Sequence, residues 1–212
     1  IADVSHYVTP GSPLDDEAKK RATSIYLPGK MIPMLPEKLS CDLCSLTSGT
    51  LRYAMGATMH ITQTGQVSLL ALEPVVIQVK QRLTYREVNE MLDGNRSVPS
   101  FWQSSLEGFS SLYSILSKQR KKRCALDFDG QDVKMKLNAK GKIAGFYVGK
   151  RGLSERYIEE MMILTNEQVA IYLGQHDVPA LYRAHLPPES DRIQALNEFL
   201  KANQLPRVSE SL

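Results

Sequence analysis

The chain has 212 residues, a formal net charge of +3, 42% hydrophobic residues and 23% charged residues. These values are typical of an ordinary soluble globular protein with enough residues to bury a core, and they exclude a low-complexity chain. The mildly basic charge is compatible with a nucleic-acid partner but is not diagnostic of one. No stretch is long and apolar enough to span a membrane, and the N-terminus as given has no basic region followed by an apolar core, so no secretory signal is visible. The non-Met start suggests a processed chain or part of a longer one.

The N-terminal half is expected to mix short strands with one helix. The helix is expected to begin at Ser12–Pro13, because Ser12 can cap it and Pro13 suits its first position. Its apolar face is expected at Leu14, Ala18, Ala22 and Ile25. The other expected elements are the end of a strand over 1–8, an ordered turn segment over 27–36, and two or more strands over 55–84 with a turn at Thr64–Gly65.

The C-terminal half is expected to contain four helices, over 85–92, 106–123, 154–173 and 190–202. Strands are expected over 125–128 and 180–184, with a hairpin over 133–148 around Lys140–Gly141. The strongest helix is 154–173, whose apolar stripe is expected at Ile158, Met161, Thr165, Val169 and Tyr172. The predicted fold class is α+β, with a largely antiparallel sheet packed with helices.

A run of basic residues closes the helix expected over 106–123. Lys118 to Arg123 reads K-Q-R-K-K-R, so five of its six residues are basic. The helix dipole alone favours cations at this end, which predicts no more than a solvated face. A patch that contacts phosphates is the alternative, and the pattern leaves both open.

Residue patterns alone indicate little chemistry, since no glycine-rich phosphate loop or known catalytic motif is present. Cys41 and Cys44 form a C-x-x-C pair, but a zinc site needs two further ligands and no second pair exists. Three cysteines without a signal peptide favour a reducing compartment. Asp127 and Asp129 share a strand face and could bind a cation, and Glu159 shares one side of its helix with Asn166.

Several ordered motifs resemble the RNB catalytic domain of bacterial and organellar ribonucleases II and R. The N-terminal ones are I-A-D-V-S-H-Y-V (1–8), R-A-T-S-I-Y-L-P-G (21–29) and I-P-M-L-P-E-K-L-S-x-D-L-C-S-L (32–46). The later ones are R-L-T-Y (82–85), R-x-A-L-D-F (123–128), I-E-E-M-M-I-L-T-N (158–166) and L-Y-R-A-H (181–185). The resemblance runs from Ile1 to about Leu186.

The resemblance implies a processive 3′→5′ exoribonuclease that degrades single-stranded RNA to nucleoside 5′-monophosphates, with two Mg²⁺ ions assisting the displacement. Tyr26 matches an aromatic residue that stacks on the 3′-terminal part of the RNA, and Phe128 matches the aromatic on the other side of the stacked bases. Glu159 matches a residue that contacts the terminal ribose hydroxyls, a contact that helps to distinguish RNA from DNA.

The sequence departs from the family pattern in three places. The family's metal-binding aspartates precede the strand at Ile1, and its T-S-P-I-R-R-Y motif is expected beyond Leu212, so the Mg²⁺ ligands are expected outside this chain. Cys124 stands where relatives often have Gly. Residues 1–212 are therefore predicted to be a partial RNB domain, without the flanking RNA-binding domains and inactive alone.

Two functions are compatible with these departures. The first is an active exoribonuclease, of which this chain supplies the part that clamps the RNA. The alternative is a catalytically dead RNB-like subunit that binds RNA or serves as a scaffold in an RNA-containing complex. The expected partner is single-stranded RNA, with no membrane and a possible larger RNA-processing assembly. The expected compartment is the bacterial cytoplasm, with plastid or mitochondrion as the alternative.

Overall fold

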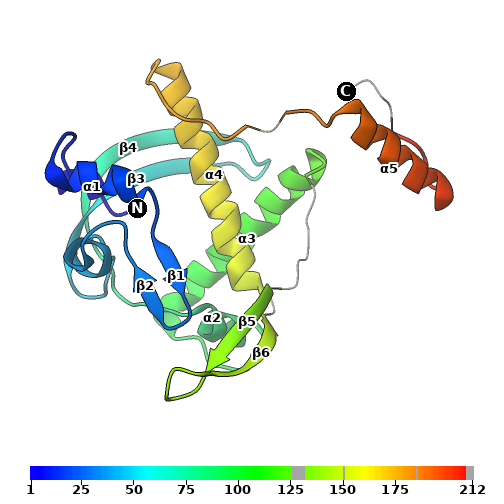
Figure 1. The fold of residues 1–212 in the computed structure, drawn as a ribbon. Coiled ribbons are helices and arrows are strands. Elements are labelled where there is room, and N and C mark those ends of the chain that lie inside the picture. Colours follow the sequence, from blue (N-terminus) through cyan, green and yellow to red (C-terminus); the bar gives the residue numbers. More distant parts are fainter. Residues whose placement is uncertain (126–131, 150, 185, 209–212) are drawn as a thin grey trace. The chain divides into compact units, whose positions relative to one another are not determined.

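The computed structural model describes residues 1–125, 132–149, 151–184 and 186–208. The chain divides into two compact units, Ile1–Val169 and Ala170–Leu212. Helices and antiparallel strand pairs make up the first unit (Figure 1), which confirms the predicted α+β class. The described strands form three separate two-stranded sheets rather than one larger sheet.

Helix α1 spans Pro13–Arg21 and begins where the sequence predicts. The Ser12 side chain caps the helix by accepting a hydrogen bond from the Asp15 backbone N–H. The predicted apolar face to Ile25 is wrong, because Ala22 adopts a left-handed conformation (φ 59°) that ends the helix. Ile25 instead begins strand β1.

Strands β1 (Ile25–Leu27) and β2 (Lys30–Ile32) form a short hairpin in the segment that was expected to be an ordered turn. Next come a π-helical turn over Lys38–Leu43, which the sequence did not predict, and the long hairpin of β3 (Leu51–Ile61) and β4 (Val67–Gln78). The predicted turn of this long hairpin is confirmed. Ala2 forms an isolated bridge with Ala54 at the β3 edge, but Val4–His6 is a short 3-10 helix, so the strand end expected over 1–8 is wrong beyond the first residues.

Gly65 shapes the β3–β4 turn for two reasons. Its φ of +83° lies in the left-handed region, where a side chain would be strained. A β-carbon at this position would also lie 2.5 Å from Gln119 Cγ. The turn therefore packs directly against the end of helix α3.

Three helices follow the long hairpin and cover the core of the first unit: α2 (Tyr85–Leu92), α3 (Ser100–Lys122) and α4 (Leu153–Gln175). Helix α2 has the predicted bounds and a capping box between Thr84 and Glu87. Helix α3 begins six residues earlier than predicted. Among the described residues of this unit, the buried apolar ones are Leu39, Ala54, Met91, Leu106, Leu116, Tyr157 and Leu164.

The apolar stripe predicted for α4 is wrong in detail. Its buried residues are Ser154, Tyr157, Glu160 and Leu164, whereas Ile158 remains 39% exposed. The reason is the position of α3, which contacts the Tyr157 side of the helix. The rings of Tyr113 and Tyr157 lie 5.2 Å apart, and Arg120 pairs with Glu160.

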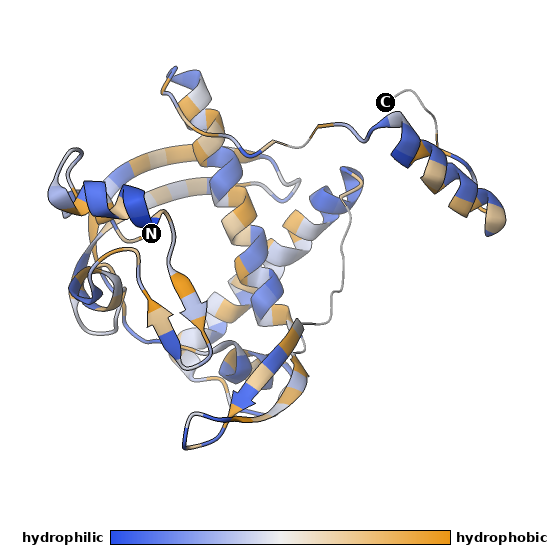
Figure 2. Cartoon of the chain, in the orientation of Figure 1, coloured by the Kyte–Doolittle hydropathy of each residue, from blue (hydrophilic) through white to orange (hydrophobic). Residues whose placement is uncertain are grey.

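A third hairpin, β5 (Asp132–Leu137) and β6 (Ile143–Gly149), confirms the predicted turn at Lys140–Gly141. Hydrophilic and hydrophobic residues alternate along β5 (Figure 2), whereas β6 carries no charged residue. The strand predicted over 125–128 cannot be scored, because residues 126–128 lie outside the described residues.

The second unit contains the end of α4 and helix α5 (Ser190–Ala202), whose predicted bounds are confirmed; the residues described between them have no regular secondary structure. The strand predicted over 180–184 is wrong, because no neighbouring strand is described in this unit for it to pair with. Tyr182 there donates a hydrogen bond to the Ala170 carbonyl oxygen (3.3 Å). Within the described ranges, no helix has the length and apolar character needed to cross a bilayer.

Candidate functional site

Glu159 and Glu160 lie side by side on α4, and arginines from two other segments hold them. Arg120 of α3 donates a hydrogen bond to Glu160 Oε1 (2.8 Å) and lies 3.4 Å from Glu159 Oε1. Arg151, which follows β6, pairs with the other oxygen of Glu159. The hydrogen bond to Glu160 raises the pKa of Arg120 above its usual value, against the opposing effect of burial.

The two acids differ in their access to solvent. The Glu160 side chain is 8% exposed, whereas that of Glu159 is 36% exposed. Glu160 thus serves to hold α3 against α4. Glu159 is oriented by two arginines, and its partly exposed side chain could still accept hydrogen bonds from a ligand.

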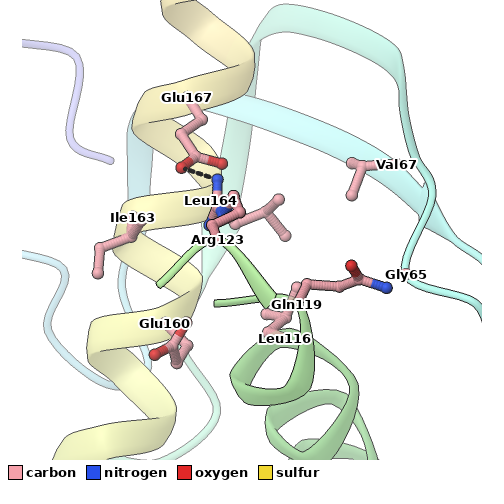
Figure 3. A pocket seen from close by; sticks show the side chains of 9 residues that line it. All are labelled: Gly65, Val67, Leu116, Gln119, Arg123, Glu160, Ile163, Leu164 and Glu167. Carbon is pink, nitrogen blue, oxygen red and sulfur yellow. Dashed lines mark hydrogen bonds and ion pairs between the residues drawn. The ribbon is translucent and has the colours of Figure 1, made fainter. Parts of the chain in front are cut away.

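A second ion pair lies further along the same two helices. Arg123 pairs with Glu167 (Figure 3), with 2.8 Å between Arg123 Nη1 and Glu167 Oε1, and both side chains are about half exposed. The pair borders a small cavity of about 180 Å³ between α3, α4 and the β3–β4 turn. The residues lining this cavity are Gly65, Val67, Leu116, Gln119, Arg123, Glu160, Ile163, Leu164 and Glu167. Two of the five basic residues at the end of α3 are therefore engaged with α4.

The N-terminal end of α4 is anchored by hydrogen bonds with helix α2. Asn89 accepts from the Ser154 backbone N–H (3.0 Å) and donates to Glu155 Oε2 (2.9 Å). The Ser154 hydroxyl donates to the Tyr85 carbonyl oxygen (3.1 Å). Burial raises the pKa of Glu155, but the hydrogen bonds from Asn89, Ser154 and the backbone outweigh it, and the net pKa is lowered. This junction fixes where α4 begins.

Tyr26 lies on β1, paired with Met31 of β2, and its side chain is 76% exposed. The turn of this hairpin lies against β5, because a β-carbon at Gly29 would be 3.4 Å from Leu137 Cδ1. The β5–β6 hairpin in turn leads to Arg151, which pairs with Glu159. The elements that carry Tyr26 and Glu159 are thus linked through this hairpin, although no hydrogen bond joins the two side chains in the described part of the chain.

The other predicted site residues can be placed only in part. Phe128 lies outside the described residues, as do Asp127 and Asp129. The sequence did not single out Arg120 and Arg151 as partners of Glu159. An available signal was the coincidence of an acidic pair on one helix with a basic run on another, which favours a salt-bridged contact.

The described side chains do not form a metal centre. The described ranges contain no group of three or more His, Cys, Asp or Glu side chains that could hold an ion. Cys41 and Cys44 are free thiols, and burial raises the pKa of Cys44. These residues do not fit a magnesium or zinc centre, and the expectation that Mg²⁺ ligands lie outside this chain stays a prediction.

A family model for the RNB domain matches residues 1–211. The chain belongs to the RNB domain family. Ribonuclease R of Thermotoga maritima is 40% identical to it over 205 residues, which cover 95% of this chain and 29% of the relative. Ribonuclease R 1 of Lactococcus lactis is 39% identical over 202 residues, covering 94% of the chain and 25% of the relative. The RNB chain thus spans less than a third of either relative.

A solved structure described as Mycoplasma genitalium RNase R in complex with ribose-methylated single-stranded RNA superposes on this RNB chain with a TM-score of 0.90. The two are 31% identical, and the match covers 99% of this chain and 33% of that one. The predicted family resemblance and fold are thereby confirmed, whereas the roles predicted for Tyr26, Phe128 and Glu159 stay predictions.

Proposed function

We propose that this RNB chain is part of a hydrolytic 3′→5′ exoribonuclease that degrades single-stranded RNA processively to nucleoside 5′-monophosphates. In this proposal residues 1–212 supply the part of the catalytic domain that clamps the RNA. The names of the relatives support the ribonuclease assignment. The RNA in the complex of the similar solved structure supports the choice of substrate.

The observation that carries the proposal is the setting of Glu159. A bare carboxylate would repel the phosphates of an RNA strand, but two arginines balance the charges of Glu159 and Glu160. The carboxylate of the partly exposed Glu159 side chain is then an acceptor of fixed orientation, suited to the 2′- and 3′-hydroxyl donors of a terminal ribose. Such an acceptor favours RNA over DNA.

The exposed ring of Tyr26 supports the same role. Stacking of a base on an aromatic ring contributes about 1–3 kcal/mol per base and does not depend on sequence, as a general RNA-degrading enzyme requires. We assign Phe128 to the opposite side of the stacked bases, from the family motif alone. The Mg²⁺ ions would stabilise the charge that develops on the phosphate, with ligands outside these residues. The proposed setting is a bacterial cytoplasm or an organelle.

The test uses the full-length protein and two RNAs that differ only in the 2′-hydroxyl of the last nucleotide. We expect the wild type to release nucleoside 5′-monophosphates in the presence of Mg²⁺ and to degrade the 2′-deoxy-ended RNA more slowly. Glu159→Gln should lower kcat/KM on the all-RNA substrate by about 10- to 100-fold, the loss expected for one or two charged hydrogen bonds. It should also remove the difference between the two substrates.

Glu73→Gln is the matched control, because Glu73 is an exposed acid on β4 without a charged partner in the described part of the chain. It should leave both rates unchanged. An unaltered preference for the 2′-hydroxyl in Glu159→Gln would refute the role of Glu159. A wild-type protein that binds the RNA but does not cut it would refute the enzyme and support the RNA-binding or scaffold subunit.

A further inference from the structure

The basic residues at the end of α3 fall into two sets with different surroundings. Arg120 and Arg123 are engaged by acids of α4. Lys118, Lys121 and Lys122 are exposed, and none has an ion-pair partner in the described ranges. The basic run is therefore not one solvated face. One set is used for packing, while the other presents three positive charges to solvent.

The three lysines line a hollow of about 400 Å³, together with Gln63, Thr64, Ile115 and Gln119. The hollow lies where the last turns of α3 meet the β3–β4 turn, which Figure 1 shows side by side. A hydrogen bond from the Gln119 amide to the Thr64 carbonyl oxygen holds the two elements together. The lysines thus border a formed surface with exposed hydroxyl and amide groups.

The helix dipole explains a preference for cations at this end but not the arrangement of these three. Lys118 lies three and four residues before Lys121 and Lys122, so the like charges are neighbours on the helix surface and repel one another. Uncompensated repulsion of this kind is relieved when an anion binds between the charges.

The chemistry of the surface favours a phosphate backbone over a folded acidic partner. Lysine ammonium groups are point charges on flexible stems, which follow successive phosphates without reading bases. The exposed Gln63 side chain beside them is suited to donate further hydrogen bonds to phosphate oxygens, whereas the Thr64 hydroxyl is already hydrogen-bonded to that of Thr62. The RNA of the proposed function is the polyanion that the protein would meet.

We propose that Lys118, Lys121 and Lys122, with the β3–β4 turn, form a lysine surface that binds phosphates of the RNA backbone outside the nucleotide clamp. This inference rests on the proposed function for the identity of its ligand. The surface does not take part in the cleavage step. It adds affinity for RNA that is long enough to reach from the clamp to the surface.

The test measures binding of a 30-nucleotide single-stranded RNA to the full-length protein, without divalent cations, over a series of salt concentrations. Each lysine–phosphate contact on a single strand contributes roughly 0.7 to the slope of log affinity against log salt. The triple variant Lys118→Gln, Lys121→Gln, Lys122→Gln should therefore lower the slope by about 2. Its affinity at 0.1 M salt should fall by at least about tenfold.

Two controls isolate the surface from net charge and from folding. Replacing the exposed Lys20, Lys140 and Lys201 by Gln removes the same charge elsewhere and should preserve the slope. The charge-preserving Lys118→Arg, Lys121→Arg, Lys122→Arg variant should also preserve it. Degradation of a four-nucleotide RNA in Mg²⁺ should be unchanged in the glutamine triple variant, which shows that the clamp is intact.

An unchanged slope in the glutamine triple variant would overturn the lysine surface, as would an equal loss of slope in the arginine variant. Failure of the proposed function would be seen differently. In that case the wild-type protein would not release nucleoside monophosphates from any RNA.

Discussion

Helix α4 is held against its neighbours by two polar junctions that differ in kind. At its first turn, the amide of Asn89 makes neutral and charge-assisted hydrogen bonds with Ser154 and Glu155. One turn later, Arg120 and Arg151 pair with Glu159 and Glu160. The amide junction, which includes the 4% exposed Ser154, is closed to solvent at its centre, whereas the arginine junction leaves Glu159 partly open.

The difference shows how one helix can be both fixed and functional. Closed hydrogen bonds determine where the helix begins and leave no acceptor for a ligand. The arginine junction uses one buried acid to hold the helices together, and the same arginine orients a second acid that remains accessible. The functional side chain thus depends on a contact that also contributes to stability.

The largest loss of folding stability is expected from Arg120→Ala. The change leaves the Glu160 carboxylate, 8% exposed, without the arginine and should lower the free energy of unfolding by about 3 kcal/mol. The matched control is Arg123→Ala, since the Arg123–Glu167 pair is about half exposed and should contribute under about 1 kcal/mol. Urea denaturation of the full-length protein measures both. Equal losses of unfolding free energy in the two variants would show that the buried and the exposed pair contribute equally to stability.

Asn89→Ala should cause an intermediate loss of folding stability. It removes the acceptor of the Ser154 N–H and a donor to Glu155, so we expect a loss of about 1–3 kcal/mol in unfolding free energy. Asn95→Ala, in the exposed loop after α2, is the control and should cost little. RNA degradation should be less affected by Asn89→Ala than by Arg120→Ala. The reverse order would contradict the separation of the two junctions.

The smallest effect is a pH dependence at the amide junction. The pKa of Glu155 is lowered in the folded protein from its ordinary 4.5, so its ionised form stabilises the fold above that pH. This contribution is lost as the pH falls below 4.5 through the folded-state pKa. Because other carboxyls also titrate there, the measurement compares urea denaturation of the wild type and Glu155→Gln between pH 7 and pH 3. A variant curve as steep as that of the wild type would exclude Glu155 as a contributor.

Helices and turns that are marked by residues close together in the sequence could be predicted from it. Helices α2 and α5 have the predicted bounds, and the β3–β4 and β5–β6 turns lie where glycine and polar residues mark them. These features depend on residues a few positions apart. The start of α1 was predicted for the same reason, because its cap and its first helical residue are adjacent.

Features that depend on distant partners could not be predicted. The buried stripe of α4 includes Glu160, which no hydropathy pattern would place inside, because its burial depends on Arg120 forty residues earlier. The strand expected over 180–184 required a neighbouring strand that the described part of its unit does not provide. Tyr26 was found only through the family motifs. Glu159 was found through those motifs and through its position on one side of the helix, and the arginines that orient it were found only through the structure.

The long hairpin has a consequence for the order in which the domain folds. Its pairing joins residues within 51–78, so it closes a small loop, and hairpins of this kind form in roughly 1–10 μs. The contacts of Ile1 with Met55 and of Arg120 with Glu160 span 54 and 40 residues, and closing such loops costs more chain entropy. The β3–β4 hairpin can therefore form before these two long-range contacts, and it offers one edge to the N-terminal residues and its turn to helix α3.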